Sequence, residues 1–585
     1  FKQKTAYEIK ECDWSSDVCS SDLEKNMGFQ LSPGVNVSEI DLTTVVPSVS
    51  TTAGAIVGDF VWGPVNTRIL VDSEITLVDR FGKPDSNTFV SFFSAANFLA
   101  YGNNLRVVRV VGATANNATV SGTGVQIKNE DDYELNYSAN THTSYGGFYA
   151  RYPGAYGNNL GVSVCANTSS FASWDYASYF DTAPATSVYA DSVGGSGDEL
   201  HVVVYDSTGK ISGTVGTVLE TFPHVSKASD AKNDDGSPNY YVTEIYNTSK
   251  YIYVAAHIDS GWGVSAVGTT FTTTIPLFDE LLGGGRDVAS SAANYESGWD
   301  LFGSTEQVDV SLLIAGNASE KSDATQEYVA QIADTRKDCV AFISPSAAVS
   351  INNPVNTADD IVAYRNTLTI NTSYAMMDSG WKYQFDKYNN VYRYVPLNAD
   401  TAGLCVYTDN VRDPWWSPAG LNRGIIKNVV KLSWNPTKTD RDTLYPNGVN
   451  PVVAFPGEGV VLFGDKTLQA KPSAFDRINV RRLFIVLEKA IAVAAKFSLF
   501  EFNDEFTRAQ FVALVEPFLR DVKGRRGIYD YRVVCDTTNN TPQVIDSNQF
   551  VGDIYIKPAR SINFIQLNFI AVRTGVEFSE IVGKF

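Results

Sequence analysis

The segment Gly459–Thr467, GVVLFGDKT, is the closest approach to a nucleotide-binding motif in the chain. In the phosphate-binding loop G-x-x-x-x-G-K-[ST], backbone N–H groups and the lysine hold phosphate oxygens. The glycine spacing fits, but Asp465 stands between Gly464 and Lys466, where its carboxylate would face the phosphates. We therefore interpret the segment as a turn after a strand. A nucleotide hydrolase remains an enzymatic alternative, and undetectable ATP turnover would exclude it.

Histidine chemistry is confined to one region of the chain. All histidines lie between residues 113 and 289, without HxxxH or HxH spacing, and we expect them to be structural: His142, His201, His224 and His257. The C-terminal half therefore cannot supply a Ser-His-Asp or Cys-His arrangement or a histidine–zinc site.

Two acidic runs resemble calcium loops only loosely. NEDD at 129–132 and KNDDGS at 232–237 lack the complete ligand pattern with its terminal glutamate. With 65 acidic residues in the chain, short acidic runs are expected by chance. The sequence thus predicts no catalytic residues, no metal site and no cofactor.

Basic side chains gather in one zone of an otherwise acidic chain, whose formal net charge is -19. The zone comprises Arg477, Arg481, Arg482, Arg508, Arg520, Arg525, Arg526 and Arg532. These arginines either form a solvated helix face or contact an acidic neighbouring protein, a contact that would orient assembly. The sequence leaves both interpretations open.

Composition indicates globular material for three or four domains, with 44% hydrophobic and 19% charged residues in 585. The negative charge argues against a nucleic-acid partner, because such affinity rests on neutralising phosphates. Cysteines outside the first 26 residues lack CxxC spacing and are expected to be buried thiols: Cys165, Cys339, Cys405 and Cys535. No apolar run reaches the roughly 18 to 20 residues that a membrane-spanning helix needs, so we expect no stable membrane insertion.

Two segments predict βαβ-like units of an α/β body. The first has strands within 53–64 and 105–111; the second, at 308–345, has a helix from Asp323 with Gln326 in a capping-box position. The apolar face of the first helix consists of Phe89, Phe92, Phe93, Ala96 and Ala100. Between the units, Ser, Thr, Gly, Asn and Tyr dominate, which indicates an inserted β-rich domain.

The C-terminal half predicts a hairpin at 379–396 that turns at Asn389 and Asn390, then a helix near 397–408. A longer helix lies within 473–497, a second follows at about 504–519, and strands within 523–536 and 549–559 form a hairpin with available edges. The apolar stripe of the longer helix is Val480, Leu483, Phe484, Leu487, Ile491, Ala494 and Ala495.

The N-terminal segment poses a different question. Residues 13–23 look like the translation of a sequencing adapter, so we expect residues 1–26 to be a non-native leader and Met27 to be the start. The next apolar residues alternate as in a strand, with a shift of register, but have no strand partner nearby: Val35, Val37, Ile40 and Leu42.

Several long motifs resemble the tail sheath proteins of contractile-tailed bacteriophages, most closely the T-even-like myophage group. They are LSPGVNVSEID, AGAIVGDFVWGP, LLGGGRD, PWWSPAGLNRG, LFGDKT, FDRINVRRLF, GIYDYRVVCDTTNNTP and IKPARSINFIQLNF, in this order. The resemblance covers about 27–112 and 281–585.

The resemblance implies an α/β and α+β multidomain chain with an α/β inner sheath body, an inserted β-rich protruding domain and extended strand arms at both ends. The predicted segments are a leader (1–26), the N-terminal arm (27–46), the first part of the inner domain (47–112), the insert (113–289), the second part of the inner domain (290–470), a C-terminal sheath domain (471–560) and the C-terminal arm (561–585).

Site roles also follow from the resemblance, because sheath subunits donate terminal strands to their neighbours. The N-terminal arm would be Val35, Val37, Ile40 and Leu42; the C-terminal arm Val576, Phe578 and Ile581; the acceptor hairpin Tyr531, Val533, Ile554 and Ile556. A tube contact is predicted at Arg520, Arg525 and Arg526.

The implied function is a non-enzymatic virion subunit that forms hexameric rings in a helical lattice around a tail tube and contracts to drive the tube through the host envelope. Its implied partners are further copies of the chain, the tail tube protein, and baseplate and tail terminator proteins. It would assemble in the host cytoplasm. The alternatives are a surface adhesin that binds glycans through the insert and the sheath of a related contractile injection system.

Overall fold

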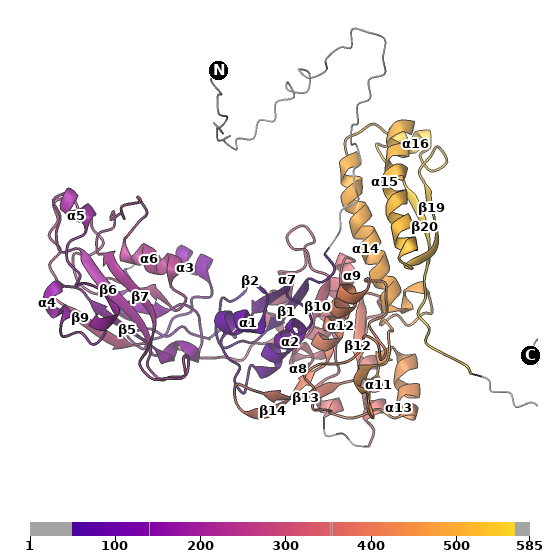
Figure 1. The fold of residues 1–585 in the computed structure, drawn as a ribbon, viewed down its shortest axis with the longest axis horizontal. Helices are drawn as coiled ribbons and strands as arrows, with labels where there is room; N and C mark the ends of the chain where they lie inside the picture. Colours follow the sequence, from indigo (N-terminus) through magenta and orange to yellow (C-terminus); the bar gives the residue numbers. More distant parts are fainter. Residues whose placement is uncertain (1–49, 140, 352, 354, 568–585) are drawn as a thin grey trace, which may run out of the picture. The chain divides into compact units, whose positions relative to one another are not determined.

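A seven-stranded sheet organises the body of the protein (Figure 1). The structure, a computed structural model, describes residues 50–567 except 140, 352 and 354. The strand order is β16-β12-β11-β10-β1-β3-β2, and only β2 runs antiparallel to its neighbour. The strands are β1 (Gly54–Gly58), β2 (Arg68–Val71), β3 (Leu105–Arg109), β10 (Leu312–Ile314), β11 (Val340–Ile343), β12 (Ala375–Asp378) and β16 (Val449–Asn450).

Both predicted βαβ units are present, as β1–α2–β3 and β10–α9–β11. Helices of the body are α1 (Glu74–Phe81), α2 (Phe89–Leu99), α7 (Ala292–Asp300), α8 (Ala318–Lys321), α9 (Asp323–Arg336), α10 (Ala347–Ser350), α11 (Thr357–Thr367), α12 (Asn398–Val411) and α13 (Lys438–Leu444). Smaller antiparallel sheets consist of β13 (Trp381–Asp386), β14 (Val391–Pro396) and β15 (Lys431–Leu432), and of β17 (Val452–Phe455) and β18 (Gly459–Leu462). The predicted hairpin with Asn390 in its turn is confirmed, with a φ of 53° at that residue.

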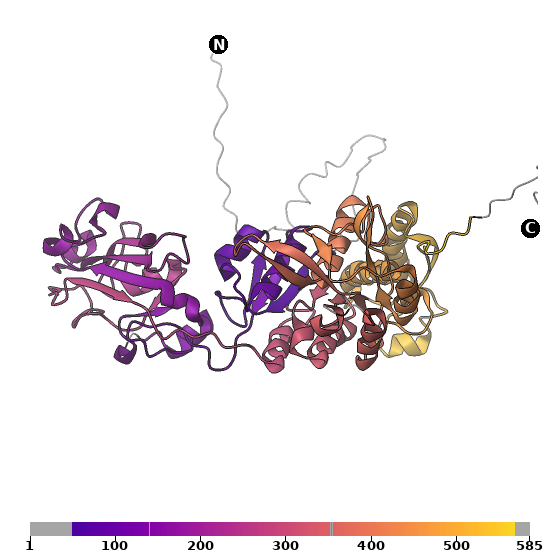
Figure 2. The ribbon, with the colours of Figure 1, turned by 90° about the horizontal axis from the view of Figure 1, so that it is seen from below.

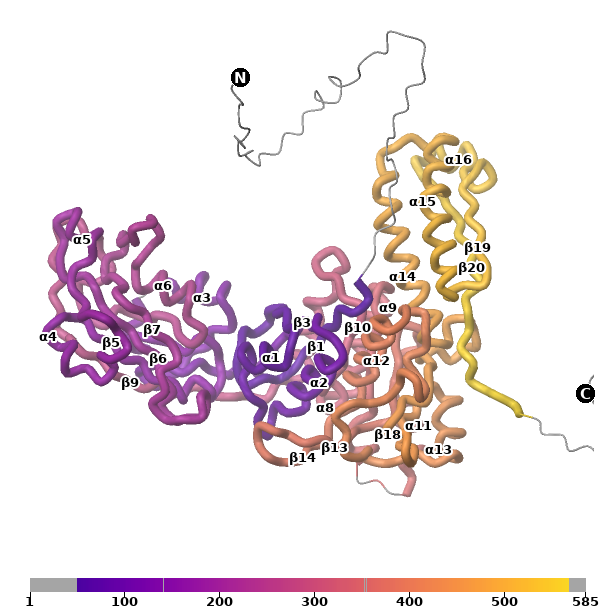
Figure 3. The backbone as a smooth tube through the Cα atoms, viewed as in Figure 1, coloured from indigo at the N-terminus to yellow at the C-terminus, as the bar shows by residue number. Residues whose placement is uncertain are grey.

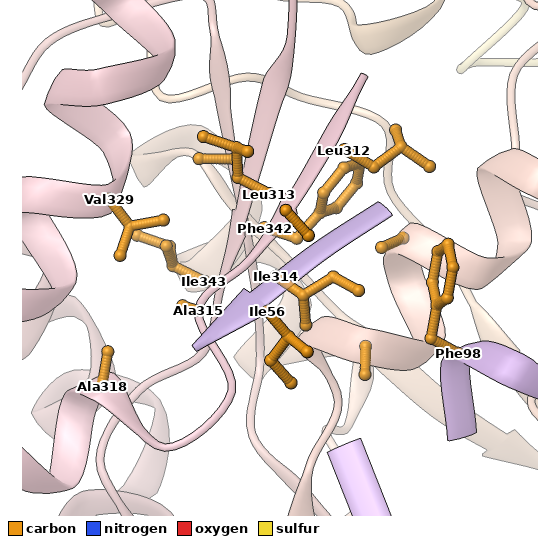
Figure 4. Close-up of a cluster of buried hydrophobic side chains, with 14 of the residues drawn as sticks. Ile56, Phe98, Leu312, Leu313, Ile314, Ala315, Ala318, Val329, Phe342 and Ile343 are labelled. Carbon is orange, nitrogen blue, oxygen red and sulfur yellow. The ribbon is translucent and has the colours of Figure 1, made fainter. Parts of the chain in front are cut away.

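The central strands are buried on both faces, as expected of a parallel sheet covered by helices. Figure 4 shows side chains of β1, β10 and β11 in one cluster with Val329 of α9 and Phe98 of α2. Gly54 permits the contact with α2, because a Cβ at this position would lie 2.6 Å from the Phe98 ring. Full burial of each such side chain contributes about 1.5–3 kcal/mol.

Two helix predictions need correction. The helix of the first βαβ unit, α2, was predicted to have one apolar face. It is buried on nearly every side, including Val90 and Phe98, because both the sheet and α12 pack against it. The start of α9 is capped by Ser322, which accepts from the Thr325 N–H at 3.0 Å. Gln326 is not part of a capping box; it is buried and donates to the Tyr364 hydroxyl at 3.2 Å. Because the N-cap is Ser322, one residue before Asp323, the third residue of the helix is Thr325, and Gln326 faces α11 instead.

The region between the two units is β-rich, as predicted. A four-stranded antiparallel sheet has the order β7-β6-β5-β9, and β4 pairs with β8. This region is the purple-to-magenta part of the ribbon in Figure 2. The strands are β4 (Phe148–Ala150), β5 (Leu160–Cys165), β6 (Glu199–Asp206), β7 (Thr217–Ser226), β8 (Ile252–Val254) and β9 (Leu277–Leu281); the helices are α3 (Glu130–Asn136), α4 (Thr168–Phe171), α5 (Val188–Ser192) and α6 (Tyr241–Thr248). Buried His201 accepts from the His224 backbone N–H and bonds the Thr182 carbonyl, a structural arrangement.

The C-terminal part pairs two long helices with a hairpin (Figure 3). These elements are α14 (Ile478–Ala495), α15 (Glu505–Gly524), β19 (Ile528–Val534), α16 (Pro542–Asp546) and β20 (Asp553–Pro558). The four cysteines named above are buried and free, which confirms that prediction. Among the described residues, no helix is long and apolar enough to cross a membrane.

Side chains fill the carboxyl edge of the parallel sheet, where α/β proteins usually bind ligands. After β1, Asp59 pairs with Lys321 at 2.9 Å and accepts from the Tyr295 hydroxyl at 3.1 Å. After β12, buried Asp378 accepts from the Ser344 hydroxyl at 2.6 Å and from the Gly380 N–H at 2.9 Å. This edge is a packed polar layer.

Asp378 makes the stability of the body depend on pH. Burial raises the pKa of Asp378 to about 8, although the hydrogen bonds from Ser344 and Gly380 act against this. The folded protein therefore keeps a proton that the unfolded chain releases near its ordinary pKa of 3.8. The free energy of unfolding should fall by up to about 1.4 kcal/mol per pH unit between these two values.

We expect Asp378→Asn to remove this dependence, because the amide does not ionise. Its oxygen can accept from the Gly380 N–H, and its NH2 group can donate to the Ser344 hydroxyl oxygen. Urea unfolding should show the variant gaining on the parent protein as pH rises from about 5 to about 8. Exposed Asp359→Asn is the control and should leave the slope unchanged. Identical slopes for Asp378→Asn and the parent would contradict the assignment.

Candidate subunit interface

The predicted acceptor hairpin is formed by β19 and β20. Their antiparallel register sets Tyr531 opposite Ile556 and Val533 opposite Ile554. These four side chains alternate with the exposed residues Arg532, Tyr555 and Lys557, as the two-residue period of a strand requires. The structure thus brings the four predicted residues together on one face of the hairpin.

That face packs against α14 and α15 and does not point to solvent. The four side chains surround a core built from Leu483, Leu487, Phe511, Val515, Leu519, Val522, Ile528 and Trp415. The Tyr531 hydroxyl also donates to the Glu516 carbonyl of α15 at 3.3 Å. These side chains therefore hold the hairpin on the helices. Only the backbone edges are left to accept a strand.

Both strands offer such an edge. Within residues 50–567, β19 and β20 make a two-stranded sheet, so each strand has one side without a strand partner. Unpaired N–H and C=O groups along an edge are a template for pairing with another chain. The hairpin ends are fixed, because buried Asn540 exchanges two hydrogen bonds with Val551 at 2.8 and 2.9 Å.

Helix α14 joins this unit to the body through buried charge. Arg482 binds the Asp409 carboxylate of α12 with two hydrogen bonds of 2.8 and 2.6 Å. Although burial acts to lower the pKa of Arg482, Asp409 raises it above its ordinary value. Arg481 lies between the rings of Tyr374 and Phe475, with centroid distances of 4.1 and 4.0 Å.

The solvated-face interpretation of the arginine zone is therefore wrong for part of it. Arg481, Arg482 and Arg508 are buried, and they fix the helices from inside. Helical periodicity left Arg481 and Arg482 outside the apolar stripe of α14, because it cannot show a second packing surface on the same helix. Arg508 donates to Asn503 at 2.7 Å in the loop that precedes α15.

The predicted tube-contact arginines lie near the end of α15. Arg525 pairs with Asp413 and with Asp521, and its guanidinium stands over the Trp415 ring at 5.1 Å. Arg526 stands over Trp416 at 5.3 Å. Arg520 is exposed on α15 itself. The structure thus brings Arg525 and Arg526 to the tryptophan pair, and two carboxylates compensate the charge of Arg525.

The two tryptophans border a cavity of about 830 Å³ that the sequence did not predict. We call it the tryptophan groove; its lining includes Trp415, Trp416, Arg423, Phe463, Arg526 and Ile562. The adjacent tryptophans of the PWWSP segment were the available signal. As a sequence motif, however, they could not show which segments close over them.

Asp465, the residue that disturbs the phosphate-loop pattern, closes one side of this groove. Its buried carboxylate accepts from Ser417 at 3.0 Å, Tyr445 at 3.1 Å and Ser561 at 2.7 Å. Asn563 donates to it as well, at 2.9 Å. The predicted turn after strand β18 is not formed: the chain runs on from Leu462 without a turn to a bridge between Lys466 and Arg477. Asp465 lies on this stretch and ties three other segments together.

The predicted arms lie outside the described residues. They are Val35, Val37, Ile40 and Leu42 on one side, and Val576, Phe578 and Ile581 on the other. In the described part of the chain, no group of His, Cys, Asp and Glu side chains is arranged to hold a metal ion.

Comparison with known proteins identifies the class of this chain. Family models match at residues 51–110 (Tail sheath protein Gp18 domain III N-terminal region), 289–468 (Phage tail sheath protein central domain) and 470–571 (Phage tail sheath C-terminal domain). Among solved structures, the crystal structure of the sheath tail protein from Desulfitobacterium hafniense has a similar fold, with a TM-score of 0.51 and 11% identity over 90% of this chain and 100% of that one.

Two curated relatives are similar over almost their whole length. The tail sheath protein of Vibrio phage KVP40 is 33% identical over 697 aligned positions, which cover 94% of this chain and 100% of that protein. The tail sheath protein of Enterobacteria phage T4 is 34% identical over 667 positions, which cover 94% and 99%. The chain therefore belongs to the phage tail sheath protein family, of which the T-even-like members were the predicted relatives.

Membership confirms that the protein is a structural component of a contractile phage tail and not an enzyme. It also extends the resemblance. With 94% of the chain covered, the insert cannot lie wholly outside the match to these relatives, although its sequence alone indicated no family.

The Arg482–Asp409 pair supports a stability prediction. Removing one partner leaves a buried charge uncompensated, so Arg482→Met should cost about 3–5 kcal/mol in unfolding free energy. Replacing both residues, Arg482→Met with Asp409→Leu, should recover most of this loss, because no isolated charge remains. Urea unfolding measures both. Equal losses in the single and double variants would contradict this account of the pair.

Proposed function

We propose that the chain polymerises as hexameric rings in a helical lattice around the tail tube, and that contraction of this sheath drives the tube through the host envelope. The observation that carries the proposal is the β19–β20 hairpin, a strand pair with two open edges on a firmly packed helix pair. Family membership supports the same function.

Strand addition is the proposed link between subunits. Val35, Val37, Ile40 and Leu42 lie in the arm given to one neighbour, and Val576, Phe578 and Ile581 in the arm given to another. Backbone hydrogen bonds would hold each arm at an edge of the acceptor hairpin, independently of most side chains. Such a link tolerates rotation of the attached bodies.

Rigid packing supports a two-state sheath. The body sheet and the C-terminal unit each have a continuous buried core, and the Arg482–Asp409 pair connects them. Rigid units that repack at their interfaces switch between discrete arrangements. Contraction would then release energy held in a kinetically trapped extended lattice, without nucleotide consumption by the sheath.

The remaining partners belong to the same proposal. The sheath would be assembled in the host cytoplasm, and baseplate and tail terminator proteins would bind it at its two ends.

We assign residues 27–46 and 561–585 to the arms, 47–112 with 290–470 to the inner domain, 113–289 to the protruding domain and 471–560 to the C-terminal domain. The family matches at 51–110, 289–468 and 470–571 support the inner and C-terminal assignments. Relatives that are phage proteins favour a phage over another injection system.

Electron microscopy tests the arm. Protein that begins at Met27 should form tubes or ring stacks, whereas protein that begins at Pro47 should stay monomeric, because it lacks the donated strand. Circular dichroism should show the same fold for both, because the hydrophobic cores of the body and of the C-terminal unit consist of residues from Ala55 onward. Monomers from both versions, even with tail tube supplied, would refute the mesh and favour the adhesin alternative.

Charge reversal tests the tube contact. Arg520→Glu should weaken assembly templated by the tail tube, because this side chain is exposed and forms no ion pair with residues 50–567. Arg526→Glu should weaken templated assembly as well, and comparison with assembly in the absence of the tube separates a tube contact from a contact between copies. Arg525→Glu should also destabilise the fold, since it would set three carboxylates together. Normal templated assembly by the Arg520 and Arg526 variants, followed by sedimentation, would count against this contact.

A further inference from the structure

The loop between α14 and α15, together with the first turn of α15, exposes several large apolar side chains. We call residues 496–506 the aromatic tip. Exposed fractions are 71% for Phe497, 62% for Leu499, 104% for Phe500, 84% for Phe502 and 75% for Phe506. Contiguous apolar exposure of this kind marks an interaction site.

The backbone and charge of the aromatic tip are also distinctive. Phe500 has a φ of 70°, a left-handed conformation that is rare for bulky residues. Three exposed carboxylates, Glu501, Asp504 and Glu505, flank the phenylalanines against one lysine, Lys496. The tip therefore presents aromatic rings within a negative rim.

The tryptophan groove has the opposite charge and the same apolar character. Trp416 is approached by three guanidiniums, those of Arg412, Arg423 and Arg526, at 5.5, 5.3 and 5.3 Å from its ring. Arg560 also lines the groove. These four arginines take part in no ion pair with the described residues. The single lining carboxylate, Asp465, is 2% exposed and already hydrogen-bonded.

Both surfaces sit at opposite ends of the same helix pair. Asn479, at the start of α14, and Lys523, at the end of α15, line the groove, and the far ends of these helices carry the aromatic tip. Eighteen residues of α14 at about 1.5 Å each separate the two surfaces by roughly 27 Å. Figure 3 shows the two helices running side by side to their common loop. A tip therefore cannot reach its own groove.

We propose that the aromatic tip of one subunit docks in the tryptophan groove of a second copy of the chain. Charge complementarity selects this occupant: the rim carboxylates meet unpaired guanidiniums while the phenylalanines cover the apolar wall. Because the two surfaces differ, the contact is head-to-tail and continues from copy to copy. The proposal rests on the proposed self-assembly and adds a side-chain contact to strand addition.

Photocrosslinking in the full-length chain locates the contact directly. A benzophenone phenylalanine analogue replaces Phe500, and the labelled chain is mixed with a heavy-isotope copy that carries no crosslinker. We expect light–heavy crosslinks at 414–423 or 559–563, found by mass spectrometry. The same analogue at Phe171, in the insert, is the control and should not crosslink there. Crosslinks from position 500 to other sites, or none between copies, would overturn the proposal.

Assembly thresholds give an independent test. Phe500→Ser at the tip and Ile562→Ser in the groove, where the side chain is 81% exposed, should each raise the concentration for half-maximal assembly at least about tenfold, or ~1.4 kcal/mol. The double variant should be no worse than either single one, because both remove one contact. Ile75→Ser, at an 83% exposed residue of α1, is the matched control.

Other results would overturn the contact. Unchanged thresholds, or penalties that multiply in the double variant, mean that the two surfaces do not meet. Lost binding of the tail tube with normal self-assembly assigns the tip to the tube. Tubes with crosslinks elsewhere refute this contact but leave the proposed function intact. Light–heavy crosslinks at the groove without tubes support this contact but contradict the proposed polymerisation.

Discussion

A buried ion pair fixes the frame on which the rest of the structure depends. Arg482 and Asp409 join α14 to α12, and α12 packs in turn against the sheet and α2. Two buried charges are costly to desolvate, so the loss of either partner alone would leave an uncompensated charge at this joint. The hairpin and the loop of aromatic residues are attached to the body through this joint, together with the contacts of Arg481 with Ser373 and of Lys489 with Asp309.

Sequence periodicity could predict the elements but not the way they are joined. The alternation at Tyr531 and Val533 and at Ile554 and Ile556 predicted the hairpin, and the runs around β1, β3, β10 and β11 predicted the parallel units. The partner of Arg482 lies 73 residues earlier in the chain, a separation that no local pattern reports. For the same reason, neither of the two interpretations of the arginine zone, a solvated face or a contact with an acidic protein, included arginines buried within the fold.

In the candidate interface too, the sequence predicted the strands but not how they pack. Its four apolar residues were predicted in the correct strands, yet their inward orientation follows from α14 and α15 packing over that face. Asp465 was recognised only as a misfit in a phosphate-binding pattern. Its actual role depends on donors from Ser417, Tyr445 and Ser561, which come from three separate segments and meet only in the fold.

The open edges of the β19–β20 hairpin could promote aggregation, and the charged residues on its solvent-facing side limit this. An edge that accepts any passing strand would also nucleate indiscriminate cross-β stacking. Arg532 and Lys557 are exposed on the outer face, so layers of identical hairpins would bring these positive charges together. The hairpin can therefore be extended sideways but resists stacking face to face, which separates ordered polymer growth from amyloid-like aggregation.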